Sequence, residues 1–163
     1  MRFPDRKLNR MSGYDYSQPN HYFVTICVKN FKPVFGKVKD CEMVLNEIGR
    51  IVQNQWLWLQ EQYNYIILHE FVCMPEHFHG IIEIANIDQE GNGRDRSLLK
   101  IKSLSELIGA FKTTSSKKIH QSGLINFKWQ KSFYDRIIET DEELENIRWY
   151  IKSNPEHYNV KVY

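Results

Sequence analysis

Two apolar runs that are separated by one Pro–Glu dipeptide constrain the fold of this chain more than any other feature. The runs read YIILHEFVCM and HFHGIIEI, and Pro75 and Glu76 lie between them. Both are rich in β-branched and aromatic residues, and a proline interrupts strand pairing. The spacing therefore predicts two adjacent strands that form an antiparallel hairpin. His77 and His79 then lie just past the turn, near one end of a sheet.

The segments around this hairpin alternate between strand-like and helix-like patterns. HYFVTICV predicts a buried strand, KPVFGKV and EMVL a small hairpin, and WQKSFYDRII a further strand. Apolar residues at helical spacing predict one helix over about 46–60, and capping-box pairs mark the starts of two more. These pairs are Ser103 with Glu106 and Thr140 with Glu143. Pro155 is expected to end the last helix, with Asn154 at its frayed end.

The order of these elements is strand, helix, two strands, helix, strand, helix. Its first six members match the ferredoxin-like split βαβ pattern, an α+β fold with a central antiparallel sheet and helices on one face. The chain has 163 residues, of which 42% are hydrophobic, which suits a single domain over 1–163. A basic leader occupies about 1–20, and the polar segment NIDQEGNGRDRS is expected to be a loop.

Composition excludes several classes of protein. No apolar stretch reaches the roughly 18 residues of a membrane span, and the N-terminal MRFPDRKLNR is charged where a secretory signal would be apolar. The three cysteines form no CxxC pair and suggest reduced thiols. We therefore expect a cytoplasmic protein with no membrane contact. The net charge of +2 is too small to establish a nucleic-acid partner by itself.

The histidine pair can be read in two ways. Alternation along a strand points His77 and His79 to one side and Phe78 to the other. Two imidazoles on one side can bind a divalent cation if another element supplies a third ligand. The alternative is two surface histidines at a turn. The last helix offers Tyr150 and Asn154 four residues apart on one side, although a tyrosine there is also typical of a core edge.

Together these residues suit phosphodiester chemistry. A metal that is held by two neutral histidines and an amide oxygen keeps its charge, polarises a phosphodiester and favours a phenolate. Attack by Tyr150 would produce a covalent phosphotyrosine, which conserves the ester energy for a later rejoining step.

Longer segments carry a resemblance to a known family. The matching segments are GYDYSQPNHYFVTICV, VFGKV, MVLNEIGRIV, HEFVCMPEHFHGIIEI and FKWQKSFYDRIIETDEELENIRWYIKSNP. Over nearly its whole length the chain resembles the single-tyrosine HUH transposases, in particular the REP-associated branch of the IS200-like family. The resemblance implies metal ligands at His77, His79 and Asn154, and a catalytic tyrosine at Tyr150. It also implies Mg²⁺ or Mn²⁺, cleavage of single-stranded DNA beside an imperfect hairpin, a 5′-phosphotyrosine intermediate and strand transfer.

The carboxylates near the pair raise a question of their own. The family usually has asparagine at the position of Glu76, where a carboxylate could strengthen metal binding or repel the DNA phosphate. Glu70 and Glu83 could orient a histidine or be solvated edge residues. His69 has the opposite strand parity to Glu70, which indicates a structural role.

Candidate DNA contacts lie in two basic, aromatic-rich stretches. Phosphate affinity comes from lysine and arginine, and stacking on aromatic rings suits unpaired bases. The candidates are Lys112, Lys117 and Lys118 on the second helix, and Lys131 and Arg136 in WQKSFYDR. The protein could act as a monomer or as a homodimer. Two alternatives stay open: a non-catalytic ferredoxin-like nucleic-acid-binding protein, and a domesticated hairpin-DNA binder that no longer transposes.

Overall fold

The computed structural model describes residues 11–86 and 100–158. Within these ranges the elements follow the predicted order, with a short 3₁₀ turn over Lys29–Phe31. The strands are β1 (Asn20–Cys27), β2 (Gly36–Lys39), β3 (Glu42–Leu45), β4 (Ile66–Cys73), β5 (His77–Ile84) and β6 (Tyr134–Ile138). The helices are α1 (Glu47–Gln62), α2 (Leu104–Gln121) and α3 (Asp141–His157). The predicted loop after β5 and the first half of the basic leader lie outside the described residues.

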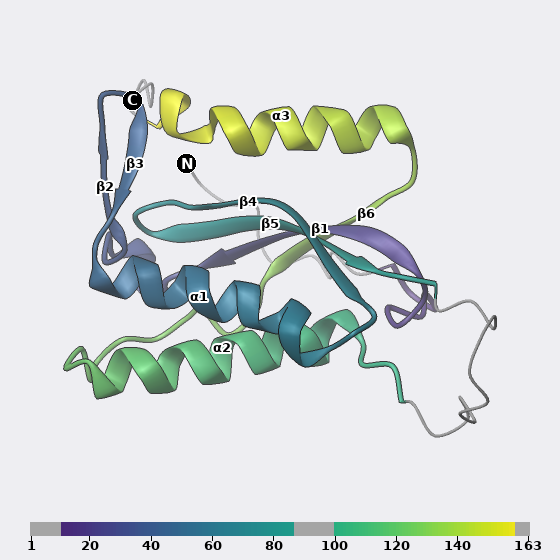
Figure 1. Cartoon of the computed structure of the whole chain (residues 1–163), viewed down its shortest axis with the longest axis horizontal. Coiled ribbons are helices and arrows are strands. Elements are labelled where there is room, and N and C mark those ends of the chain that lie inside the picture. Colours follow the sequence, from purple (N-terminus) through teal and green to yellow (C-terminus); the bar gives the residue numbers. More distant parts are fainter. Residues whose placement is uncertain (1–10, 87–99, 159–163) are drawn as a thin grey trace.

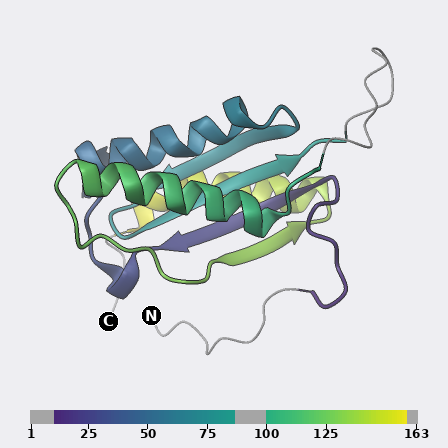
Figure 2. The ribbon, with the colours of Figure 1, turned by 90° about the horizontal axis from the view of Figure 1, so that it is seen from below.

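Four strands form the central sheet, in the order β4-β5-β1-β6, and every neighbouring pair is antiparallel (Figures 1 and 2). Strands β2 and β3 form a separate antiparallel hairpin, as predicted. The turn at Pro75–Glu76 joins β4 to β5, and the backbone of Met74 bonds to His77 across it at 2.8 Å. This strand order is that of the ferredoxin-like fold, so the predicted fold class is confirmed.

Helices α1 and α2 pack together on one face of the sheet, which we call the core face (Figures 1 and 2). Asn46 caps α1 through the amide of Gly49, and the capping box of Ser103 and Glu106 at α2 is complete. The apolar side of each helix points into the main core. Aromatic rings fill its centre: Tyr22, Phe35, Trp56, Phe78, Phe111, Phe127 and Trp129.

Helix α3 covers the opposite face, which we call the histidine face (Figure 1). The ferredoxin-like pattern of the first six elements predicted helices on one face, which α1 and α2 confirm, and it did not say on which face the last helix would lie. A second, smaller apolar cluster holds α3 there; its members are Phe23, Ile81, Ile138, Ile147 and Ile151, with Val72 and Leu144 beside them. Leu144, Ile147 and Ile151, which lie three and four residues apart on α3, meet the side chains that point away from the main core.

Three local predictions were wrong in detail. Pro155 does not end α3, which continues to His157 and places Asn154 inside the helix. A proline removes only one donor, and the residues after it keep the helix going. The strand predicted from WQKSFYDRII is limited to Tyr134–Ile138, and Trp129 makes only an isolated bridge with Val28. At α3 only half of the capping box forms, since Glu143 accepts from Glu139 instead of from Thr140.

A β-bulge in β4 overturns the predicted parity of His69 and Glu70. The register with β5 shifts between Leu68 and Phe71, so these two residues lie opposite Ile81 alone. Two residues that share one partner position no longer alternate between the faces. Both side chains therefore reach α3 on the histidine face.

Candidate active site

His77 and His79 lie at the start of β5, on the histidine face. Phe78 between them points into the main core, where its ring lies 4.7 Å from that of Trp56. The fully buried ring fixes the strand, and the two imidazoles are left side by side on the other face, 4.5 Å apart. The strand alternation that was predicted for this stretch is therefore present in the structure.

Helix α3 brings Tyr150 to the same place. Its ring lies 5.4 Å from that of His79 and 6.2 Å from that of Phe23, edge to face in both cases. The residue is 47% exposed, so a substrate can approach it from solvent. Asn154 follows one turn later on the same side of α3 and is partly buried. The structure thus brings Tyr150 to the histidine pair, from which it is far apart in sequence.

Glu76 contacts the first histidine directly. The residue is only 7% exposed, and its Oε1 lies 3.1 Å from Nδ1 of His77. A carboxylate accepts hydrogen bonds, so the imidazole proton lies on Nδ1 and the lone pair of Nε2 stays free for a metal. Oε2 accepts a hydrogen bond of 2.8 Å from the hydroxyl of Tyr158 just beyond α3. The unexpected carboxylate therefore orients a predicted ligand.

Thr25 of β1 supports the second histidine. Its Oγ1 lies 2.8 Å from Nδ1 of His79, and the two residues are direct partners in the sheet. When Nδ1 donates to that oxygen, Nε2 of His79 keeps its lone pair. Burial, with a smaller effect of the neighbouring His77, lowers the pKa of His79 well below its usual value of 6.5. His79 is therefore neutral at pH 7, the form in which imidazole binds metals.

These residues fit a divalent cation by their chemistry. Nδ1 of His77 and of His79 each contacts an oxygen, which suits ligation through Nε2, and Asn154 on α3 carries an amide oxygen. Such a mixed set leaves the positive charge of the ion uncompensated, which suits phosphate binding. Glu70, for which the sequence left open a role in orienting a histidine or a place at the solvated edge of the sheet, pairs with Arg148 and Lys152.

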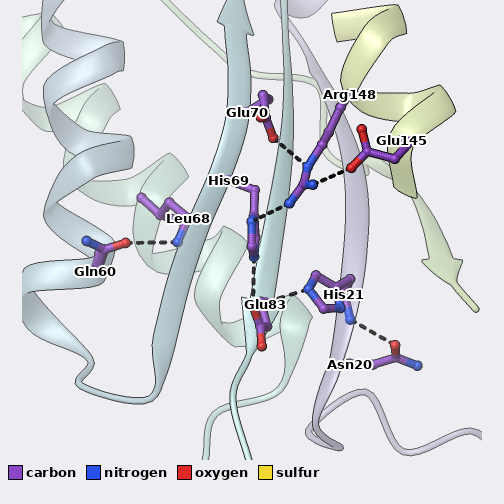
Figure 3. A network of polar contacts seen from close by, with 9 residues as sticks. All are labelled: Asn20, His21, Gln60, Leu68, His69, Glu70, Glu83, Glu145 and Arg148. Atoms are coloured by element: carbon purple, nitrogen blue, oxygen red, sulfur yellow. Dashed lines mark hydrogen bonds and ion pairs between the residues drawn. The ribbon is translucent and has the colours of Figure 1, made fainter. Parts of the chain in front are cut away.

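A second cluster on the histidine face also offers metal-type ligands. Atoms of His21, His69 and Glu83 lie within 4.8 Å of one another (Figure 3). However, NH2 of Arg148 lies 3.2 Å from Nδ1 of His69, and a guanidinium can only donate. The proton of His69 must then lie on Nε2, from which it is donated to Glu83 at 2.7 Å. The cluster is therefore a hydrogen-bonded network, and the nitrogen that a metal would need is occupied.

The predicted DNA contacts are scattered. The ammonium group of Lys112 donates to the carbonyls of Gln130, Lys131 and Ser132, so this side chain holds a loop. Lys117 and Lys118 are exposed on α2, which lies across the sheet from Tyr150. A DNA strand bound at Tyr150 could contact these two lysines only if it continued around the edge of the sheet to the core face.

Of the other two predicted contacts, Arg136 lies beside α3. Lys131 is exposed in the loop before β6. Arg136 pairs with Glu143 at 2.5 Å and borders a groove of about 350 Å³. Asp135, Glu139 and Glu143 also line that groove, and their carboxylates oppose phosphate binding.

Sequence reasoning missed three residues of this region. Thr25, Arg148 and Tyr158 contact His79, His69 and Glu76 respectively. Thr25 could have been found by pairing the predicted strands in register, because it lies directly opposite His79. The other two have no signal in the sequence, since their contacts depend on where α3 docks and how far it runs.

Comparisons with known proteins agree with the fold. No family model matches the chain. A REP-associated tyrosine transposase, solved bound to a REP hairpin, has the same fold with a TM-score of 0.58; the match covers 91% of this chain and 74% of that one at 19% identity. A Deinococcus radiodurans protein considered a transposase gives a TM-score of 0.52 over 88% of this chain and 95% of that one, at 14% identity. The class of protein is thus a ferredoxin-like α+β domain with the fold of these structures.

One relative defines the family more narrowly. The chain is 31% identical over 161 residues to a Haemophilus influenzae protein described as uncharacterized, and the match covers 92% of this chain and 88% of that one. The chain belongs to the same family as this Haemophilus protein. Within the described ranges, no helix is both long and apolar enough to cross a bilayer.

Proposed function

We propose that this protein is a single-tyrosine HUH transposase of the REP-associated type, which cuts and rejoins single-stranded DNA in a metal-dependent reaction. One observation carries the proposal: Tyr150 on α3 lies against the histidine pair of β5, with rings 5.4 Å apart for Tyr150 and His79 and 4.5 Å apart for the two histidines. A half-exposed tyrosine beside two oriented, metal-type imidazoles suits a nucleophile better than a core-edge residue.

In the proposed reaction Oη of Tyr150 attacks a DNA phosphorus atom. The bond from phosphorus to the 3′-oxygen breaks, and the products are a 5′-phosphotyrosine and a free 3′-hydroxyl. His77, His79 and Asn154 would hold Mg²⁺ or Mn²⁺, which supplies charge stabilisation for the phosphodiester and favours the phenolate. Glu76 and Thr25 contact Nδ1 of the two imidazoles, which would leave Nε2 of each ring for the metal. Attack of another 3′-hydroxyl on the phosphotyrosine reverses the cut and transfers the strand.

Single-stranded DNA with an imperfect hairpin is the proposed partner. The fold is shared with a transposase that was solved with a REP hairpin, and the histidine face offers aromatic surface beside the site. Tyr134 of β6 is 44% exposed and is the sheet partner of Thr25, which in turn pairs with His79. An exposed ring two strands from the histidines is placed to stack on an unpaired base.

The first test is replacement of the nucleophile. Tyr150→Phe removes only the hydroxyl, so the protein should keep its fold and its hairpin affinity. With Mn²⁺ and a single-stranded oligonucleotide that carries a hairpin, the wild type should give a covalent adduct on a denaturing gel, and the variant should give none. Tyr134→Phe is the matched control and should still form the adduct. An adduct with Tyr150→Phe would show that another residue is the nucleophile.

The metal is tested at the histidines. His77→Ala and His79→Ala should each lower the rate of cleavage at least a hundredfold, and a chelator should abolish it in the wild type. Cleavage that continues in the presence of chelator would refute the metal role. Hairpin binding that depends on salt, without any adduct under these conditions, would instead support the non-catalytic alternatives.

A further inference from the structure

We infer that Arg148 is a positioning residue, which fixes the rotation of α3 on the sheet and so holds Tyr150 against the histidine pair. The inference rests on the proposed function for its consequence in catalysis. The contacts that hold α3 on the sheet through Arg148 lie on the opposite side of α3 from Tyr150.

The guanidinium of Arg148 has three partners on two elements (Figure 3). Nε pairs with Oε2 of Glu70 at 2.9 Å, and NH2 donates to Nδ1 of His69 at 3.2 Å, which links α3 to β4. NH1 binds Glu145 on α3 itself at 2.6 Å. The Nε and Oε2 atoms are both buried and have no hydrogen-bond partner, so they interact as an ion pair. A buried charge that is moved away from its partner is left unpaired, so this ion pair favours one position of α3 over others.

The β-bulge in β4 provides both of the partners that Arg148 has on that strand. The bulge turns two consecutive residues, His69 and Glu70, to the histidine face, where a regular strand would offer one. The network continues from His69 through Glu83 to His21 on β1. Arg148 is thus anchored to a set of polar groups that spans β4, β5 and β1.

The angular positions on α3 explain why this anchor bears on Tyr150. At 100° per residue, Arg148 and Tyr150 lie on opposite sides of the apolar stripe formed by Ile147 and Ile151. An apolar stripe alone resists rolling of a helix weakly, because isoleucine contacts have no fixed direction. A roll of about 20° would move a tyrosine hydroxyl, roughly 9 Å from the helix axis, by about 3 Å. Such a displacement is enough to impair attack on a phosphorus atom.

The test compares Arg148→Ala with Arg50→Ala. Arg50 on α1 makes one exposed hydrogen bond to Leu45 and serves as the matched arginine control. With saturating hairpin DNA and Mn²⁺, Arg148→Ala should form the adduct at least tenfold more slowly, and Arg50→Ala should react at the wild-type rate. The affinities for Mn²⁺ and for DNA should be unchanged in both. Free guanidinium should partly restore the rate of Arg148→Ala, which a general loss of stability would not allow.

Arg148→Lys covers the case in which the alanine variant does not fold. Lysine keeps the charge but cannot bind Glu70, His69 and Glu145 with one planar group, so its rate should also fall. A wild-type rate in either folded variant would overturn the inference, and so would a change in DNA affinity alone.

Docking can also be measured without catalysis. Amide hydrogen exchange in α3 should be faster in Arg148→Ala than in Arg50→Ala, and unchanged exchange would contradict the anchor. If the wild type forms no adduct at Tyr150, the proposed function fails while this exchange test still decides the docking. If the wild type reacts and Arg148→Ala reacts equally fast, only the positioning inference fails.

Discussion

At the scale of single residues, Glu76 changes most between sequence and structure. From the sequence alone its carboxylate could strengthen metal binding or repel DNA. In the structure it is buried, and both oxygens have partners, Nδ1 of His77 and the hydroxyl of Tyr158. A buried carboxylate that accepts the imidazole proton fixes the ring and increases the basicity of its free nitrogen. Its position favours the first of the two interpretations.

Replacing Glu76 should therefore weaken metal binding. Glu76→Ala removes the acceptor at Nδ1 of His77, and we expect the affinity for Mn²⁺ to fall by roughly 10- to 100-fold. Tyr158→Phe is the control, because it removes one hydrogen bond of Glu76 but leaves the bond to His77, so its loss should be smaller. Calorimetric titration of each folded variant with Mn²⁺ measures both effects. Wild-type affinity in Glu76→Ala would show that His77 needs no such partner.

At the scale of elements, β5 serves two purposes because its two sides face different surroundings. His77 and His79 occupy the histidine face, while Phe78 and Gly80 face α1 across the core. A Cβ atom at Gly80 would lie 2.7 Å from the ring of Trp56 and 3.0 Å from that of Phe78. The glycine thus lets Trp56 pack directly on the backbone of the strand that carries the histidines.

Gly80→Ala should destabilise the protein by about 1–3 kcal/mol, because two buried rings must move to admit one methyl group. Gly109→Ala offers a matched control on α2, where a Cβ atom would meet nothing within 4 Å. That change should instead stabilise the helix by about 0.5–1 kcal/mol. Chemical denaturation measures both free energies of unfolding. Equal free energies of unfolding for the two variants would mean that Trp56 does not pack tightly on β5.

At the scale of the whole molecule, the sheet separates the main core on one face from the candidate active site on the other. The large aromatic core lies under α1 and α2, whereas α3 is held by a small apolar cluster and by the ion pairs of Arg148. Burial raises the pKa of Glu70, but its own backbone amide, Arg148 and Lys152 lower it more, so the net pKa lies below its usual value of 4.5. Docking of α3 therefore depends on an ionised carboxylate.

This dependence predicts a loss of stability in acid. Because the folded-state pKa of Glu70 is depressed, the unfolded chain binds the proton more readily, and stability falls as the pH drops below about 4.5. Glu70→Gln should lower the free energy of unfolding at pH 7, and its deficit relative to the wild type should shrink in acid. Denaturation curves at neutral pH and below about pH 4 test this. A deficit that does not change with pH would exclude the ionised form of Glu70 as its cause.

Much of the fold could be predicted because it is encoded locally. The hairpin around Pro75, the capping box at Ser103 and the order of the elements along the chain all follow from periodicity and turn chemistry over a few residues. Parity along β5 also placed His77 and His79 on one face. The bulge at His69 and Glu70 was not predictable, since the shift in register arises between two strands and leaves no pattern in either one.

The sequence by itself therefore determined the elements, their order, the side of β5 on which the histidines lie, and the tyrosine and asparagine that share one side of the last helix. Only the tertiary structure decided that α3 covers the opposite face from α1 and α2. It also decided that Glu76 orients His77 and that Arg148 anchors α3 to β4. The reason is physical: periodicity records which side of an element is apolar, whereas hydrogen bonds and ion pairs between distant residues exist only once the elements have packed.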